Sequence, residues 1–101
     1  MRVKITLASG NLRQSFGFFT QELEVGGDVS SVEDVLRTIC CEGGGSLADR
    51  LIEGGRVSPQ YAVFLNGVNI EALQGLKTHV RDEGKVVVMD VVARIAGGRW
   101  E

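Results

Sequence analysis

Hydrophobic and polar residues alternate strictly near the start of the chain, over residues 2–7. Val3, Ile5 and Leu7 fall on one side of an extended chain, with charged or polar side chains on the other. This period of two predicts a half-buried strand. A second alternating segment over residues 20–25 ends at a glycine pair, so the two segments are predicted to form a hairpin with a long connection.

The period changes to that of a helix in the next part of the chain. Apolar residues recur at helical spacing over residues 32–41, which predicts the main amphipathic helix. Ser31 precedes this segment and Asp34 lies three residues further on, a pattern typical of a capping box. The glycine run 43–45 is expected to end the helix.

The remaining segments predict one short helix and three strands. A second helix is expected over residues 47–53, with Ser46 as its cap and a glycine pair at its end. Strands are expected over residues 61–65, 68–70 and 85–92, with one helical turn over 72–76. Asn66-Gly67 is a strong signal for a tight hairpin turn, and the valine-rich last segment suits a central strand. The order predicts an α+β domain, a mixed sheet of four to five strands with one main helix, in which the first and last strands can lie parallel.

Composition narrows the class of protein. A chain of 101 residues has room for one domain, and 11 Lys/Arg against 13 Asp/Glu give a net charge of −2. That balance argues against nucleic-acid or membrane-surface partners, which call for a basic face. No apolar run approaches the ~20 residues that span a bilayer. Cys40 and Cys41 are adjacent and cannot form the framework of a secreted disulfide protein, so a cytoplasmic location is expected.

The familiar patterns of catalysis are absent from the sequence. His79 is the only histidine, so neither a zinc site with paired histidines nor a serine–histidine relay can be assembled. Cys40-Cys41 lacks the spacing of a redox pair, and one of the two is interpreted as an apolar packing residue. Gly43–Gly45 is not followed by the Lys-Ser/Thr of a phosphate loop. We therefore expect a protein that is not an enzyme, with no catalytic residue, no metal ligand and no bound cofactor.

One glycine pair, Gly97-Gly98, has no connecting role that explains it. It follows the last predicted strand, whereas the other pairs lie at element boundaries. Residues 93–98 could extend about 20 Å from the fold at about 3.3 Å per residue. Without Cβ atoms, the tip could enter a channel that any side chain would block. The alternative interpretation is an inert, frayed tail.

The sequence also resembles a known family over nearly its whole length. The residues that carry the resemblance are the first strand, Leu12-Arg13, Leu65-Asn66-Gly67-Val68-Asn69-Ile70, Leu73, Gly75-Leu76, Thr78, Asp82-Glu83-Gly84-Lys85-Val86-Val87 and Ala96-Gly97-Gly98. In this order they are similar to the MoaD/ThiS-type sulfur carriers of molybdopterin and thiamine biosynthesis. The resemblance implies the ubiquitin-like β-grasp fold.

The resemblance also implies a mechanism. In such carriers, an adenylyltransferase of the ubiquitin-activating type uses ATP to adenylate the terminal glycine carboxylate. Sulfur then replaces AMP to give a thiocarboxylate, which a sulfur-acceptor synthase consumes. Carried over to this chain, the reactive carbonyl is that of Gly98 and its slender neighbour is Gly97. Whether molybdopterin, tungstopterin, thiamine or a related product receives the sulfur stays open.

Two departures from the family pattern lead to further expectations. Arg99, Trp100 and Glu101 follow the diglycine, so residues 1–98 are expected to form the carrier domain and 99–101 a removable extension. Cleavage between Gly98 and Arg99 by a processing metallopeptidase is the predicted maturation step. Residues 90–95 replace the Phe-Pro-Pro-type run of the family, which leaves open the activating enzyme that fits.

A docking surface follows from the alternation of the strands. If the odd-numbered residues of the two strands at 61–65 and 85–92 face the helix, Phe64, Val86 and Val88 face the open side of the sheet. Three apolar side chains on a solvent face suggest a partner site; alternatively, the long segment 43–58 covers them. Two other functions stay open: a protein modifier joined through Gly98 to lysines of its targets, and a β-grasp interaction module with an inert tail.

Overall fold

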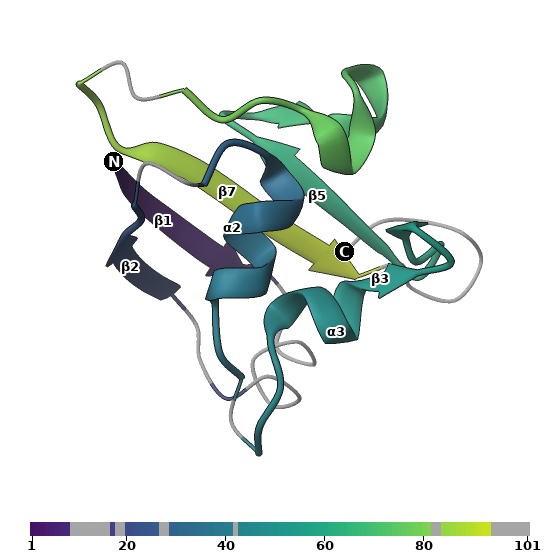
Figure 1. The fold of residues 1–101 in the computed structure, drawn as a ribbon. Helices are drawn as coiled ribbons and strands as arrows, with labels where there is room; N and C mark the ends of the chain where they lie inside the picture. Colours follow the sequence, from purple (N-terminus) through teal and green to yellow (C-terminus); the bar gives the residue numbers. More distant parts are fainter. Residues whose placement is uncertain (9–16, 18–19, 27–28, 42, 82–83, 94–101) are drawn as a thin grey trace.

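The structure is a computed structural model, and it describes residues 1–8, 17, 20–26, 29–41, 43–81 and 84–93. Figure 1 shows a mixed sheet with helices packed across it. The elements are β1 (Arg2–Leu7), β2 (Thr20–Glu24), α2 (Val32–Thr38), α3 (Leu47–Leu51), β3 (Ile52–Glu53), β4 (Arg56–Val57), β5 (Tyr61–Leu65), β6 (Val68–Asn69), the 3₁₀ helices η1 (Ile70–Ala72) and η2 (Gly75–Lys77), and β7 (Val87–Ala93).

The main sheet has five strands in the order β2-β1-β7-β5-β6. β1 and β7 are parallel, with Ile5 opposite Met89, and the other neighbouring strands are antiparallel. The valine-rich β7 lies in the centre, where β-branched side chains pack well on both sides. The predicted mixed sheet, its parallel central pair and the first hairpin are confirmed.

The core lies between the sheet and the helices. Figure 1 shows α2 crossing one face of the sheet, with α3 beside it on the same face. Ile5 and Met89 from the sheet and Leu36 from α2 have no exposed surface. Each such side chain contributes about 1.5–3 kcal/mol through burial.

Both predicted helix caps are present. The Ser31 hydroxyl accepts from the Asp34 backbone N–H at 3.2 Å, and the Asp34 carboxylate accepts from the Ser31 N–H. Ser46 and Asp49 repeat this capping box at α3. Hydrogen bonds from the Ser30 backbone N–H and then from Ser31 hold the pKa of Asp34 below its usual value. Bonds from the backbone and side chain of Ser46 lower the pKa of Asp49 in the same way.

The main helix ends earlier than its apolar spacing predicts. α2 stops at Thr38, and Ile39 is extended, with φ −87° and ψ 123°. Its carbonyl accepts from the Leu47 backbone N–H at 2.7 Å, and the Cys41 N–H donates to the Gly45 carbonyl. The backbone of this segment therefore bonds to the chain beyond the glycine run instead of continuing the helix, although Ile39 and Cys41 remain in the core.

The second helix also ends early, at Leu51, because its glycine pair serves a different purpose. Gly54 and Gly55 have φ values of 62° and 82°, and they connect β3 and β4 in a small antiparallel hairpin. Positive φ at both central residues is the geometry of a two-residue turn. The prediction of a helix to residue 53 was wrong for this reason.

Smaller differences concern the C-terminal half. Asn66 and Gly67 have φ values of 50° and 86°, which confirms the tight turn between β5 and β6. The predicted helical turn over 72–76 is instead the two 3₁₀ helices. The last strand begins at Val87 rather than residue 85 and continues to Ala93.

An ion-pair cluster joins α2 to η2. The Glu33 carboxylate accepts from Arg37 at 2.7 Å and lies 3.5 Å from the Lys77 ammonium. The Arg37 hydrogen bond is the main cause that lowers the pKa of Glu33. Because Arg37 and Lys77 are exposed, this cluster contributes little to the stability of the fold.

Candidate functional site

The face of the sheet opposite the helices carries the predicted apolar patch. Val63 and Leu65 belong to the buried core, so the alternation of β5 directs Phe64 to the open face. Phe64 is half-buried, whereas Val86 and Val88 are 41% and 36% exposed. Val88 lies on the same face of β7 as Phe64 on β5, and Val86 directly precedes β7.

The strand register sets the neighbours of each side chain. Phe64 lies opposite Asp90 on β7 and Asn69 on β6. Val88 lies beside Lys4 of β1 and, on its other side, exchanges hydrogen bonds with Asn66. The Asn66 N–H donates to the Val88 carbonyl at 2.7 Å, and the Val88 N–H donates to Asn66 Oδ1 at 3.0 Å. Phe64 and Val88 are therefore diagonal neighbours, about 7–8 Å apart.

The helix α3 of the segment 43–58 lies on the other side of the sheet (Figure 1). It contributes Leu47 and Leu51 to the core, and Figure 1 shows α3 on the face that α2 occupies. The helix of this segment therefore does not cover Phe64, Val86 and Val88.

Two apolar residues on the open face were missed in the sequence. Ala62 lies opposite Val92, and both follow the alternation of Phe64 and Val88 along their strands. Val92 is half-buried and Ala62 is buried. The signal was available, because the period of two on β7 continues past Asp90.

Charged side chains border this apolar surface on β1 and β2. Arg2 Nε lies 3.1 Å from a carboxylate oxygen of Glu24, and Lys4 lies opposite Glu22. These pairs are exposed, so each contributes well under about 1 kcal/mol to stability. They place charges of both signs along one side of a face on which Phe64 and Val88 lie next to Asp90.

The strand that leads to the diglycine is paired with β1 as far as Val91 and with β5 as far as Ala93. Tyr61 of β5 lies opposite Ala93, and on the β1 side the Ala8 N–H donates to the Val91 carbonyl at 2.9 Å. Gly97, Gly98 and Arg99 lie outside the described residues. The predicted activation and cleavage positions thus follow a fixed strand end in the sequence, and they stay predictions.

The cysteines and the histidine occupy the places expected of structural residues. Cys41 is buried in the core, and burial raises the pKa of its thiol. Cys40 and His79 are exposed. Among the described residues, no three acidic, cysteine or histidine side chains gather in a group that could hold a metal ion. In the same part of the chain, no helix has the length and apolar character to cross a membrane.

Comparisons with known proteins extend these observations. Small archaeal modifier protein 3 of Haloferax volcanii is 42% identical over 66 residues, which make up 65% of this chain and 71% of that protein. A solution structure of a Haloferax volcanii protein has a TM-score of 0.70 and 31% identity, over 97% of this chain and 87% of that one. Small archaeal modifier protein 1 of Methanosarcina acetivorans shares the fold with a TM-score of 0.66 and 24% identity, over 96% of each chain. No family model matches the chain.

Proposed function

This chain belongs to the small archaeal modifier proteins, which are ubiquitin-like β-grasp proteins of the MoaD/ThiS type, and on that premise we propose that it is a sulfur carrier activated at Gly98. It acts as a protein substrate, not as an enzyme. The proposal rests on the position of Gly97-Gly98 in the sequence, a few residues after the end of the central strand β7. A short segment without side chains at its tip can reach into the active site of another protein.

The proposed reaction has two steps once a free carboxylate exists at Gly98. The carboxylate oxygen attacks the α-phosphate of ATP in an adenylyltransferase, and pyrophosphate leaves. A hydrosulfide ion then attacks the Gly98 carbonyl carbon, the bond to the phosphate oxygen breaks, and AMP leaves. The product is a thiocarboxylate, from which an acceptor synthase takes the sulfur. ATP belongs to the activating partner, so the carrier itself needs no bound cofactor.

Maturation is the first step of this proposal. Arg99, Trp100 and Glu101 follow Gly98 in the sequence, so the carboxylate is formed only when the Gly98–Arg99 peptide bond is hydrolysed. A processing metallopeptidase is the proposed agent. Intact-mass spectrometry of the protein from its native cells tests this step. A population that retains residues 99–101 throughout contradicts it.

The open face is the proposed docking surface for the activating enzyme. Val88 on β7 and Val86, which precedes that strand, are exposed apolar side chains, and Phe64 lies on the same face of the neighbouring strand β5. A partner that covers this surface removes apolar area from water, which favours association.

The activation step is tested with a chain that ends at Gly98. Incubated with ATP, sulfide and the adenylyltransferase from the same organism, it is expected to gain the mass of one oxygen-to-sulfur exchange. The full chain 1–101 under the same conditions is expected to gain nothing, because its Gly98 carbonyl is in a peptide bond. The variant Gly97→Ala in the shorter chain is the matched control and should react at least about tenfold more slowly, since misplacement near a reacting group is costly.

Failure of the shorter chain to gain sulfur overturns the carrier proposal. In that case, the inert interaction module becomes the better account. A reaction that proceeds equally well in the Gly97→Ala variant would show that the tail does not need its narrow tip.

A second candidate function is supported by the comparison itself, because the relative of 42% identity is named a modifier protein. As a modifier, the chain would be joined through Gly98 to lysine side chains of its targets. Trypsin cleaves after Arg94, so the remnant left on a modified lysine would be residues 95–98. Peptides that carry this four-residue branch in a cell digest would support conjugation, and their absence alongside a thiocarboxylate would favour sulfur transfer alone.

A further inference from the structure

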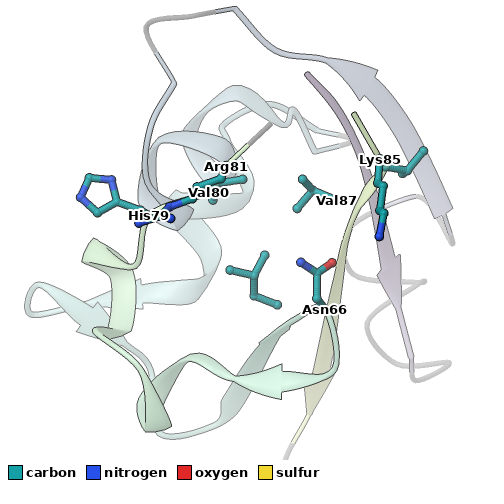
Figure 2. Close-up of a pocket in the computed structure, with 8 residues that line it drawn as sticks. Asn66, His79, Val80, Arg81, Lys85 and Val87 are labelled. Carbon is teal, nitrogen blue, oxygen red and sulfur yellow. The ribbon is translucent and has the colours of Figure 1, made fainter. Parts of the chain in front are cut away.

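A second surface lies at the end of the sheet where β7 begins. It is a pocket of about 340 Å³ between the β5–β6 turn, the start of β7 and the segment 79–81. Figure 2 shows Asn66 and Val87 pointing towards its centre, with Lys85 on the side of β7 and His79 at the opposite side. Its lining residues are Leu65, Asn66, His79, Val80, Arg81, Lys85, Val86 and Val87.

The pocket combines an apolar floor with a basic rim. Leu65, Val80 and Val87 are buried, whereas Arg81 and Lys85 are exposed. No acidic side chain of the described residues lines the pocket. Arg81 and Lys85 form no ion pair within the described part of the chain, in contrast to Arg2, Arg37 and Lys77.

The walls of the pocket are held by backbone hydrogen bonds. The Val80 N–H donates to the Ser30 carbonyl at 3.0 Å, and the Val32 N–H donates to the Thr78 carbonyl at 3.0 Å. On the other side, the Asn66 N–H donates to the Val88 carbonyl at 2.7 Å. The site is therefore formed in advance, which lowers the entropy that a ligand loses on binding.

The size and charge of the pocket indicate which class of ligand it can bind. Its volume is near the lower limit of about 300–1,000 Å³ for ligand sites, so it suits one or two side chains and not a large cofactor. The apolar floor favours an aliphatic group, and the two cations favour carboxylates beside it.

The pocket lies at the opposite end of β7 from Ala93, the last residue before the diglycine segment that the structure describes. β7 runs from Val87, in the pocket, to Ala93, where the tail begins, and a strand of that length spans about 20 Å. A partner seated at the pocket leaves the other end of β7 accessible.

We propose that this pocket binds an acidic peptide segment of a partner protein, with one aliphatic side chain on the apolar floor and flanking carboxylates on Arg81 and Lys85. The site lies at the other end of β7 from Ala93, and it shares only Val86 with the patch of Phe64, Val86 and Val88. It gives the protein a second means of recognition, which can hold a partner while the tail is engaged elsewhere.

The probe for this site is a capped eight-residue peptide with one leucine flanked by aspartates, titrated into isotope-labelled protein of residues 1–101. Amide shifts are expected at Val80, Val87 and Asn66, and affinity is expected to fall with added salt. The double variant Arg81→Glu with Lys85→Glu should weaken binding at least about tenfold, because it places like charges against the carboxylates. Arg56→Glu is the matched control: this exposed arginine lies outside the pocket, and its reversal should leave the affinity within about twofold.

Three outcomes overturn the proposal. The first is a set of shifts centred on Phe64 and Val88 instead of the pocket. The second is equal binding of a peptide in which serine replaces the leucine, which would leave charge attraction alone. The third concerns Asp82 and Glu83, which follow Arg81 in the sequence and lie outside the described residues. Their neutralisation as Asp82→Asn with Glu83→Gln should keep or raise the affinity, and a loss would contradict the charge argument.

Discussion

The two faces of the sheet are built from the same strands but differ in what their side chains do. On the helix face, Ile5 and Met89 have no exposed surface, whereas on the open face Val88 is 36% exposed. A shift of one residue along β1 or β7 moves a position from one environment to the other. Stability and recognition are therefore separated by the alternation of single residues, so that variants can address one without the other.

The largest expected effect comes from the helix face. Ile5→Ala removes a fully buried side chain from the pair that it forms with Met89. We expect a loss of about 2–5 kcal/mol in the free energy of unfolding, because a cavity remains in a packed core. Urea denaturation measures it, and a loss under about 1 kcal/mol would mean that the core is loosely packed there.

The matched variant on the open face is Val88→Asp. Val88 is adjacent to Lys4, which offers the new carboxylate an opposite charge, but aspartate is disfavoured in a central strand, so we expect a stability loss of about 1 kcal/mol. Sulfur loading by the adenylyltransferase should nevertheless fall at least about tenfold, because an apolar contact is replaced by a charge that loses its water on docking. Full loading in a folded variant contradicts the docking role of this face. Phe64→Asp is a poorer test, because Phe64 lies opposite Asp90 and like charges would meet.

A smaller effect, on the free energy of unfolding, is expected from variants of Asn66. This residue of the β5–β6 turn accepts a hydrogen bond from the Val88 N–H of β7. Asn66→Ala removes the acceptor of the Val88 N–H and places alanine at a φ of 50°. We expect a loss of about 1–2 kcal/mol from these two causes together. Asn66→Gly keeps the backbone freedom and loses only the hydrogen bond, so it should cost less than alanine in the same urea measurement. Equal losses would mean that the turn geometry contributes nothing.

The smallest expected effect is a change in the stability of the fold with pH. The folded-state pKa values of Asp34 and Asp49 are lowered by their capping hydrogen bonds, so the stabilisation is present above the unfolded value of about 3.9. It is lost as pH falls below about 4 and the carboxylates are protonated. The urea midpoint should therefore decline in this range, and less so in Asp34→Asn with Asp49→Asn. An identical decline in the double variant would mean that other ionisable groups cause the loss of stability at low pH.

Local chemistry explains which parts of the fold could be predicted. The alternation of β1, the valines of β7 and the capping box at Ser31 are determined by near neighbours, and all three were predicted from the sequence. The end of α2 was not, because Ile39 and Cys41 keep a helical spacing while their backbone bonds to Gly45 and Leu47. Apolar periodicity reports burial, and it does not report which backbone partner a segment finds.

The candidate sites show the same division. Phe64 and Val88 were placed on one face by counting residues along single strands. The basic pocket joins the β5–β6 turn, the segment around Val80 and the start of β7, which are separate stretches of the sequence. Its existence depends on the three-dimensional arrangement of these stretches, and no pattern within any one of them indicates it.

The central place of β7 has a consequence for biosynthesis. β1 and β5 are separated in the sheet by β7, which is translated after both. A chain still emerging from the ribosome therefore has an incomplete sheet until the stretch just ahead of the diglycine has been made. Completion of the domain is therefore coupled in time to synthesis of the stretch before the diglycine, so a molecule that has folded has already been translated as far as β7.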